Sequence, residues 1–492
     1  KTMDFALAAA RRATEVGQVE SAGDWLRIGV EQSAKLGAPA IDHGELVVRY
    51  LSEGFSTQQQ ATLRKHLDDA LEKLEALPHQ TEETRRLEAD LLHWRAWILF
   101  EVEADTAAAK AACENALRRL AGVPTCAERA RALIRLGWLC WRGGPVADAI
   151  PPLEAALVEA RGVGDDALVA LALHELGMAY ERNGRRDEGI RLIRDSTRLA
   201  EEAGDRNLFL RGHTNLGGVL SAEGDFRQAV PLWSAGLDQA RRSMQAHFVF
   251  WLGVNLGQAA AEMGELGQSV AYLEEATAAA RRLGLPVHGA LELAYAHANL
   301  GRYEEARSVM AAWAGHEAEL QVQVGVAIVT AALAWQLDQR SAVSELYDAL
   351  RRAEMVESGG PVHLARMAAR VGHREALDWA MDWMRDAASR SAGSPVAAQA
   401  RWVSALADSD PVRAVGTIQG AAAEFDEVWQ LRLAAAFAYA DAAWITAHAG
   451  LPAADDAARR AAEAHAAIGA VPLLEPLPIA DSAPSGSLTR ET

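Results

Sequence analysis

The stretch LALHELGMAYERNGRRDEGIRLIRDSTRLA, residues 171–200, decides the fold of this chain. Leu173, Leu176 and Tyr180 recur at the spacing that places side chains on one face of a helix, and Gly184 follows where that helix would end. A second apolar stripe begins after the glycine. The stretch therefore predicts two amphipathic helices joined by a tight turn.

The same pattern recurs at a spacing of forty residues. A Leu-Gly pair occurs at Leu136-Gly137, Leu176-Gly177, Leu216-Gly217 and Leu256-Gly257. A second glycine keeps the same step at Gly144, Gly184, Gly224 and Gly264. A fixed period of this length, with small residues at fixed phases, is the signature of a helical repeat array. We therefore expect an all-α fold, a right-handed α-solenoid in which antiparallel helix pairs stack into a superhelix.

The two kinds of glycine predict two different roles. Gly177 and Gly217 fall inside a helix, where glycine costs about 1 kcal/mol relative to alanine, so their recurrence indicates close packing of paired helices. The glycines at 144, 184, 224 and 264 fall in the turn, where only glycine adopts a positive φ at little cost.

The regularity of the repeat divides the chain into four parts. Residues 125–314 hold the regular repeats. Residues 1–124 are interpreted as divergent N-terminal helical repeats and residues 315–470 as degenerate C-terminal ones, because helical patterning continues there without the full set of glycines. Residues 471–492 are rich in Pro, Ser and Gly, which predicts a disordered tail or a linker.

The composition argues against several classes of protein. A chain of 492 residues is too long for one compact core, a limit that an array escapes because each repeat packs on its neighbours. The net charge of -18 argues against a direct nucleic-acid or anionic-membrane surface and leaves a basic partner open. Three cysteines without metal-ligand spacing fit a cytoplasmic protein, and no apolar run reaches the length of a membrane span. Because the opening Lys1-Thr2-Met3 already looks helical, we expect a piece of a larger protein.

The repeat resembles the tetratricopeptide repeat. Its signature positions are occupied by Leu176, Gly177, Tyr180, Gly184, Gly189 and Ser196, and by the run Leu300-Gly301-Arg302-Tyr303-Glu304-Glu305-Ala306. The period is forty rather than roughly thirty-four residues, and no proline closes each unit. Both departures are shared by the longer-helix branch that includes kinesin light chains and quorum-sensing receptors.

The alanine-rich later half resembles the C-terminal region of large bacterial signalling ATPases, including maltose-regulon-type transcription activators. In those proteins the repeats form a sensor arm that receives an inducer or a partner protein. The run Leu488-Thr489-Arg490-Glu491 resembles the opening of the DNA-binding domain that follows in some of these activators.

The resemblance implies that the first helix of each repeat lines a concave, ligand-binding face. Its inward positions carry Trp94, Arg131, Trp138, Trp141, Arg142, His174, Glu181, Arg182, Arg211, Asn215, Trp251, Asn255 and Gln258. Aromatic rings and guanidinium groups can stack on and hydrogen-bond a peptide or a sugar, although tryptophans at this spacing also fill helical cores. Asn215 and Asn255 occupy equivalent places, and an amide can hold a peptide main chain or instead bond a neighbouring helix.

No catalytic motif is found, whether a phosphate-binding loop, a zinc-protease helix or a nucleophile elbow. We therefore expect no enzyme activity, no metal and no cofactor. The sequence predicts a regulatory module that recognises a peptide, a protein or a small inducer and relays it to an attached effector. Two alternatives stay open: a free-standing scaffold for a protein complex, and an enzyme site in the region after Leu320.

Overall fold

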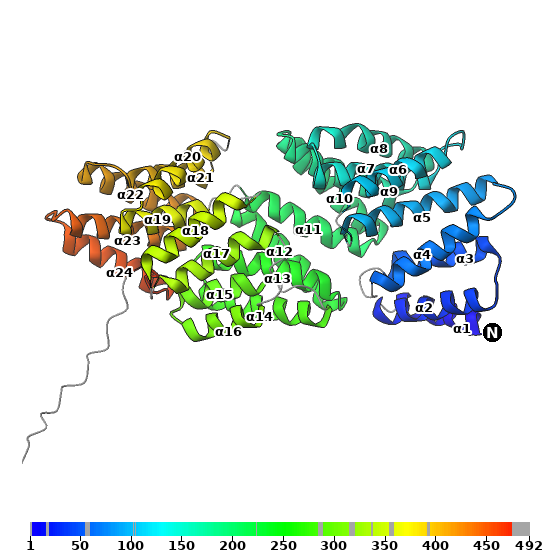
Figure 1. Ribbon diagram of the computed structural model, residues 1–492, viewed down its shortest axis with the longest axis horizontal. Coiled ribbons are helices and arrows are strands. Elements are labelled where there is room, and N and C mark those ends of the chain that lie inside the picture. The colour runs from blue at the N-terminus through cyan, green and yellow to red at the C-terminus, as the bar shows by residue number, and fades with distance from the viewer. Residues whose placement is uncertain are drawn as a thin grey trace, which may run out of the picture. The chain divides into compact units, whose positions relative to one another are not determined.

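A computed structural model describes residues 2–15, 19–54, 60–101, 103, 105–222, 224–283, 289–313, 320–335, 338–353, 359–390 and 394–474. In these ranges the chain forms 24 α-helices, one short 3₁₀ helix and one short π-helix, and no strand. From α1 to α10 and from α17 to α24, each helix packs on the next along the chain (Figure 1). The expected all-α solenoid of helix pairs is confirmed.

The chain divides into two compact units. The first comprises Lys1–Val219 and Pro231–Val249, and the second comprises Leu220–Val230 and Phe250–Thr492. Helices α1 (Thr2–Glu15), α2 (Val19–Lys35), α3 (Ala40–Gly54), α4 (Gln60–Glu75), α5 (Glu82–Glu101), α6 (Thr106–Arg119), α7 (Ala127–Gly143), η1 (Val146–Ala149), α8 (Ile150–Val163), α9 (Asp166–Arg182) and α10 (Arg186–Ala203) belong to the first unit. Helices α11 (Arg206–Ser221), α12 (Phe226–Arg242) and α13 (Ala246–Glu262) contribute residues to both units.

The second unit continues the same helical pattern to residue 474. Its further elements are α14 (Leu266–Leu283), α15 (Gly289–Asn299), α16 (Tyr303–Trp313), α17 (Leu320–Ala334), α18 (Gln339–Arg352), α19 (Gly359–Val371), α20 (Arg374–Arg390), α21 (Pro395–Ala405), α22 (Pro411–Glu424), η2 (Phe425–Trp429), α23 (Arg432–His448) and α24 (Ala454–Ile468).

Glycine-aspartate pairs separate the helices of the regular region. Gly164 and Gly204 adopt left-handed backbone angles, with φ of 76° and 73°, and end α8 and α10. The following aspartates begin the next helices: Asp165 accepts the Leu168 N–H at 3.1 Å, and Asp205 accepts the Leu208 N–H at 3.0 Å. One dipeptide therefore both stops a helix and caps its successor.

The turn glycines behave as expected in three repeats and differently in one. Gly184, Gly224 and Gly264 have positive φ values of 81°, 77° and 82°. Gly144 instead has an extended backbone, with φ of -163°, so the expected positive φ is wrong at this position. The cause is Pro145, because the proline ring disfavours helical angles for the residue before it and favours an extended backbone there.

The packing glycines inside the first helices are confirmed in their expected role. A Cβ added to Gly137 would lie 2.3 Å from the Leu153 side chain, and one added to Gly217 would lie 2.3 Å from Trp233 Nε1. At Gly177 the added Cβ would meet the backbone oxygen of Gly189 at 2.9 Å. The helix-propensity cost of these glycines is offset by a closer approach of the paired helices.

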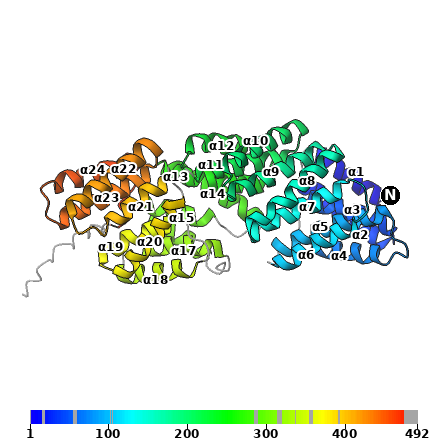
Figure 2. The same ribbon diagram turned by 90° about the horizontal axis from the view of Figure 1, so that it is seen from above.

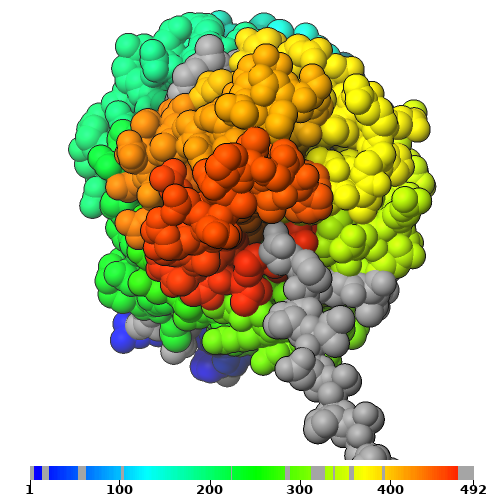
Figure 3. All heavy atoms as spheres, turned by 90° about the vertical axis from the view of Figure 1, so that its left-hand side faces the viewer, coloured from blue at the N-terminus to red at the C-terminus, as the bar shows by residue number. Residues whose placement is uncertain are grey.

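The stack in the second unit curves until late helices meet early turns. A Cβ added to Gly224 would lie 2.6 Å from Pro395, and one added to Gly264 would lie 2.3 Å from Ile468. Figure 3 shows this end of the unit, where α23 and α24 (red) lie beside α22 (orange). Contacts between segments so distant in sequence mean that the second unit closes on itself.

Three residues of the segment that the sequence predicts to be a tail, Val471, Leu473 and Leu474, take part in this closure. The N–H of Val471 donates to the carbonyl of Asn299 at 2.8 Å, and Trp335 Nε1 donates to the carbonyl of Leu474 at 3.1 Å. Leu473 and Leu474 are buried. The remainder of the predicted tail, residues 475–492, lies outside the described residues.

Candidate functional site

Four first helices of the first unit, α5, α7, α9 and α11, carry most of the predicted binding residues. Helix α5 packs directly on α7, and α7 on α9 (Figure 2). We call the surface that these four helices form the first-helix wall. It includes Trp94, Arg131, Trp138, Trp141, Arg142, His174, Glu181, Arg182, Arg211 and Asn215. The other three predicted residues, Trp251, Asn255 and Gln258, lie on α13.

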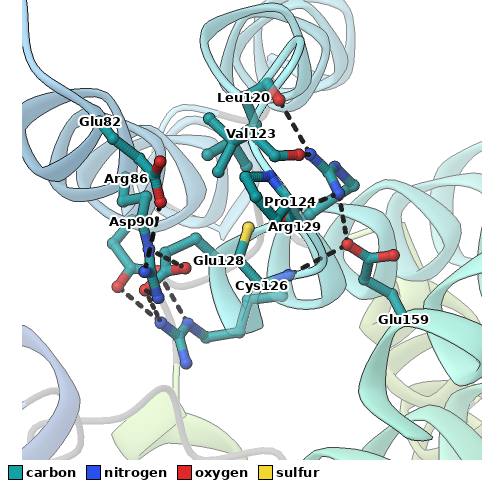
Figure 4. A network of polar contacts seen from close by, with 11 residues as sticks. Glu82, Arg86, Asp90, Leu120, Val123, Pro124, Cys126, Glu128, Arg129 and Glu159 are labelled. Atoms are coloured by element: carbon teal, nitrogen blue, oxygen red, sulfur yellow. Dashed lines mark hydrogen bonds and ion pairs between the residues drawn. The ribbon is translucent and has the colours of Figure 1, made fainter. Parts of the chain in front are cut away.

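Ion pairs connect the first helices near the start of the wall. Arg131 on α7 donates through Nε and Nη2 to the two oxygens of Asp90 on α5, each at 2.7 Å. Arg86 on α5 donates in the opposite direction to Glu128 on α7 at 2.9 Å (Figure 4). Bidentate pairs of this kind fix the rotation of both helices, so the repeats are locked in register.

A second clasp, also drawn in Figure 4, joins α7 to the loop before it and to α8. Arg129 Nη2 donates to the carbonyl of Leu120 at 2.9 Å, and the N–H of Cys126 donates to Glu159 at 3.2 Å. Arg129 also forms an ion pair with Glu159. This clasp stabilises the start of α7, which positions the wall residues farther along the helix.

A buried carboxylate connects three helices in the centre of the wall. Glu175 on α9 is 1% exposed. It accepts the Trp141 indole N–H from α7 at 3.0 Å and forms an ion pair with Arg211 on α11. Because the carboxylate is both hydrogen-bonded and paired, its burial is compensated and the two neighbouring side chains are held in place.

His174 and Asn215 form a second link between α9 and α11. The two side chains meet with 2.9 Å between His174 Nε2 and Asn215 Nδ2. Burial, and then the positive charge of Arg211, lower the pKa of His174 well below its usual value, so the ring is neutral and accepts the amide hydrogen. The predicted ligand amide of Asn215 is therefore oriented by the neighbouring repeat.

Guanidinium groups stack on the tryptophans of the wall. Arg135 and Arg142 lie 5.0 and 5.2 Å from the ring centre of Trp138, and Arg182 lies 4.9 Å from that of Trp141. Both tryptophan rings are buried, so they fill space between helices as well as supporting the arginines. Trp94 at the start of the wall is half-buried.

The charges of the wall are layered. The carboxylates lie underneath: the side chains of Glu175 and Asp90 are 2% and 11% exposed. Their partners Arg211 and Arg131 are 34% and 30% exposed, and Arg142 and Arg182 are exposed. Burial and the neighbouring Arg135 and Arg142 lower the pKa of Arg211 to about 10, which leaves it charged at neutral pH. The wall therefore presents guanidinium groups to the solvent.

The predicted residues on α13 are less connected. Trp251 is exposed, and Gln258 donates to Glu292 on α15 at 3.0 Å. Asn255 is half-buried, and among the described residues its side chain has no hydrogen-bond partner. Asn215 and Asn255 are equivalent in the repeat, but the structure gives only the first a partner.

Sequence reasoning missed a buried charge cluster in the second unit. Asp441 on α23 is fully buried and accepts Arg366 Nε at 3.0 Å, Arg370 Nη1 at 2.8 Å and Trp402 Nε1 at 2.9 Å. Burial raises the pKa of Asp441, but Arg366 and Arg370 outweigh it and the pKa is lowered. The sequence feature that could have indicated this cluster is Asp441 itself, an aspartate within the alanine-rich stretch around Phe437.

The described residues offer little for catalysis. They contain no group of three or more His, Cys, Asp or Glu side chains that could hold a metal ion. Cys113, Cys126 and Cys140 are buried free thiols, and burial raises the pKa of each, which makes the thiolate scarce at neutral pH. Among the described helices, none is long and apolar enough to cross a membrane.

Comparison with known families locates the repeat in the sequence. The tetratricopeptide repeat family matches residues 254–282, which fall in α13 and α14. Residues 254–282 therefore match one tetratricopeptide repeat. A search of curated proteins finds no match.

Several solved structures have a similar fold. A Rap protein complexed with competence and sporulation factor has a TM-score of 0.53 at 12% identity, over 73% of this chain and 98% of that one. The apo quorum sensor NprR from B. thuringiensis has a TM-score of 0.51 at 12% identity, over 72% and 99%. A signal transduction ATPase with a tetratricopeptide repeat sensor from Pyrococcus horikoshii scores 0.41 at 14% identity, over 63% and 51%. At these identities the first two likenesses show the fold.

Proposed function

We propose that this chain is a non-catalytic regulatory module that captures a peptide segment on the first-helix wall and relays its binding to an attached effector. One observation supports it above the others: the half-buried Arg131 and Arg211 and the Asn215 amide are held in fixed positions by partners in neighbouring repeats. Groups held in this way lose little conformational entropy when a ligand arrives, so the wall is preorganised for binding.

The fold neighbours support a peptide as the ligand. The Rap protein was solved with competence and sporulation factor bound, and NprR is described as a quorum sensor. We extend this class of ligand to the present chain. We also place the module in the cytoplasm, where its three thiols would stay reduced.

Selection of binding peptides tests this function. The purified chain, immobilised through a terminal tag, is offered a display library of short random peptides, and recovered peptides are measured by calorimetry. We expect saturable binding that weakens in the Asn215→Ala variant while its circular dichroism spectrum stays that of the folded chain. Recovery of no binding peptide would contradict the proposal and favour a scaffold for folded partners.

A further inference from the structure

We propose that a pocket in the second unit, between α20, α21 and α22, binds a small organic anion whose carboxylate contacts Arg385 and Arg401 and whose apolar body lies on alanines of the pocket. This inference goes beyond the proposed function, because it concerns another ligand and other helices. It does not follow from the charge of the whole chain, which is -18, so it depends on the local arrangement of side chains.

The pocket follows from the small residues on one face of α21. Helices α20 and α22 both pack on α21 (Figure 1). Between them α21 presents Ala397, Ala400 and Ser404, which recur at the spacing of one helix face. Side chains this small leave the space between α20 and α22 open, and the pocket measures about 400 Å³. Small-molecule pockets are commonly about 300–1,000 Å³, so this one fits a small molecule better than an extended peptide.

Arg413, one of the three arginines that line the pocket, is already neutralised. Its Nε and Nη2 donate to the two oxygens of Asp408, each at 2.6 Å. Hydrogen bonds from Arg413, and then from the N–H of Asp410, lower the pKa of Asp408 to about 2, so this carboxylate is ionised at neutral pH. The pair is bidentate and satisfies itself, so it offers no net charge to a ligand.

The other two arginines, Arg385 and Arg401, are held more loosely. Arg385 Nη1 donates to Asp382 at 2.9 Å, and Arg401 Nη2 donates to Glu424, so each pair uses a single nitrogen. The two arginine side chains are 69% and 50% exposed, and exposed pairs of this kind contribute little free energy. In the part of the chain that the structure describes, neither guanidinium bonds a second group, so its other N–H groups can bind a ligand carboxylate. Both partner carboxylates lie outside the pocket lining, so the charge that faces a ligand here is positive.

Alanines supply the apolar part of the pocket. Ala388 on α20 and Ala400 on α21 are half-buried and line it. An aliphatic or aromatic body placed on them is removed from water, which favours binding. Apolar lining together with guanidinium groups selects an amphipathic anion, because an amine is repelled by the arginines and a fully polar anion leaves the alanines uncovered.

Titration with three eight-carbon probes tests the inference. Octanoate, octanol and octylamine share one chain and differ in the head group, and binding of each to the intact protein is measured by calorimetry. We expect saturable binding of octanoate that weakens as salt is added, and at least about tenfold weaker binding of octanol and octylamine. Absence of octanoate binding, or equal binding of octanol or octylamine, overturns the proposal and leaves the capture of peptides by the first-helix wall untouched.

Removal of the two arginines tests the position of the carboxylate. The double variant Arg385→Gln with Arg401→Gln is expected to weaken octanoate binding by at least about tenfold, because the charged N–H donors are lost. Arg374→Gln on α20 is the matched control, because that arginine is also exposed and paired with one aspartate but lies outside the pocket lining. Unchanged affinity in the double variant, or an equal loss in the control, overturns the assignment.

Substitutions that fill the pocket test the position of the apolar body. Ala400→Leu adds an apolar side chain on the open face of α21, changes no charge, and is expected to weaken octanoate binding by at least about tenfold. Ala388→Leu fills the pocket from α20 and is expected to act in the same way. Leucine is a good helix former, so the circular dichroism spectrum should stay that of the folded chain. Unchanged affinity in both folded variants overturns the placement between α20 and α22.

Discussion

The two units of this chain use charged residues in opposite ways. In the first unit, buried carboxylates such as Glu175 hold arginines whose guanidinium groups reach the surface. In the second unit, Asp441 holds Arg366 and Arg370 in the interior, where both arginines are also buried. The same repeat thus yields guanidinium groups at the surface in one unit and a buried charge cluster in the other. We infer that peptide binding belongs to the first unit and rigidity to the second.

The largest expected effect is the removal of the buried aspartate. Asp441→Ala leaves Arg366 and Arg370 without their shared carboxylate, so we expect the second unit to lose about 3–5 kcal/mol of unfolding free energy. Denaturant unfolding followed by tryptophan fluorescence measures the loss. Asp378→Ala is the control, because its pair with Arg374 is exposed and contributes little. Equal effects of the two substitutions would contradict the role of the cluster.

The next largest effect on stability is expected from substitutions at glycines of the first unit. Gly177→Ala would press a methyl group against the Gly189 backbone oxygen and the Ile193 amide, at 2.9 and 3.1 Å, and is expected to cost about 1–3 kcal/mol. Gly218→Ala meets no atom and is expected to stabilise α11 by about 0.5–1 kcal/mol. Thermal unfolding of the two variants separates a packing glycine from an open one. Destabilisation by both would show that the space at Gly218 is filled.

The pH dependence of stability tests the environment of His363 in the second unit. Burial lowers the pKa of His363 to about 3, and its Nε2 lies 2.9 Å from the Tyr295 hydroxyl. The unfolded ring gains a proton near pH 6.5 while the folded ring resists it, so stability is full above pH 6.5 and falls as the pH drops toward 3. The slope of the unfolding free energy against pH approaches about 1.4 kcal/mol per pH unit.

This titration needs a background without Glu262. Burial raises the pKa of Glu262 to about 7, so its contribution runs in the opposite direction: stability is gained as the pH falls from about 7 toward the unfolded pKa. Urea unfolding from pH 7 to pH 4 in Glu262→Gln should show the His363 slope, and Glu262→Gln with His363→Gln should lose it. Identical slopes in the two variants would refute the assignment to His363.

The smallest expected change in stability belongs to the wall arginines. Arg142 and Arg182 are exposed, so Arg142→Gln with Arg182→Gln should alter the unfolding free energy by less than about 0.5 kcal/mol. Chemical unfolding checks this value. A larger loss would mean that the cation–π contacts with Trp138 and Trp141 stabilise the fold. The arginines of the wall would then serve stability, as Arg366 and Arg370 do in the second unit.

The sequence predicted the repeat because its decisive features are local. Leu-Gly pairs and turn glycines recur at a fixed step, so the helix pairs and the role of Gly217 could be inferred without contacts. The positive φ that the repeat predicts for Gly144 is wrong, because Pro145 favours an extended backbone at the residue before it.

The partners within the wall could not be inferred in the same way. Arg131 bonds a residue 41 positions away, but Trp141 and Arg211 reach Glu175 across 34 and 36 positions, so no fixed spacing finds them. The closure of the second unit joins segments about two hundred residues apart, such as Gly264 and Ile468. The period of the sequence predicts the repeat, but it does not predict where the stack of helices curves back on itself.

Hydrogen exchange with and without a selected peptide tests most directly the claim that the first unit binds the peptide and the second unit does not. We expect the peptide to slow exchange in α7, α9 and α11 and to leave α19, α21 and α23 unchanged. The double variant Arg142→Gln with Arg182→Gln should lose this protection. Slower exchange confined to α19, α21 and α23 would contradict the account, because it would place the ligand at the centre that Asp441 already fills.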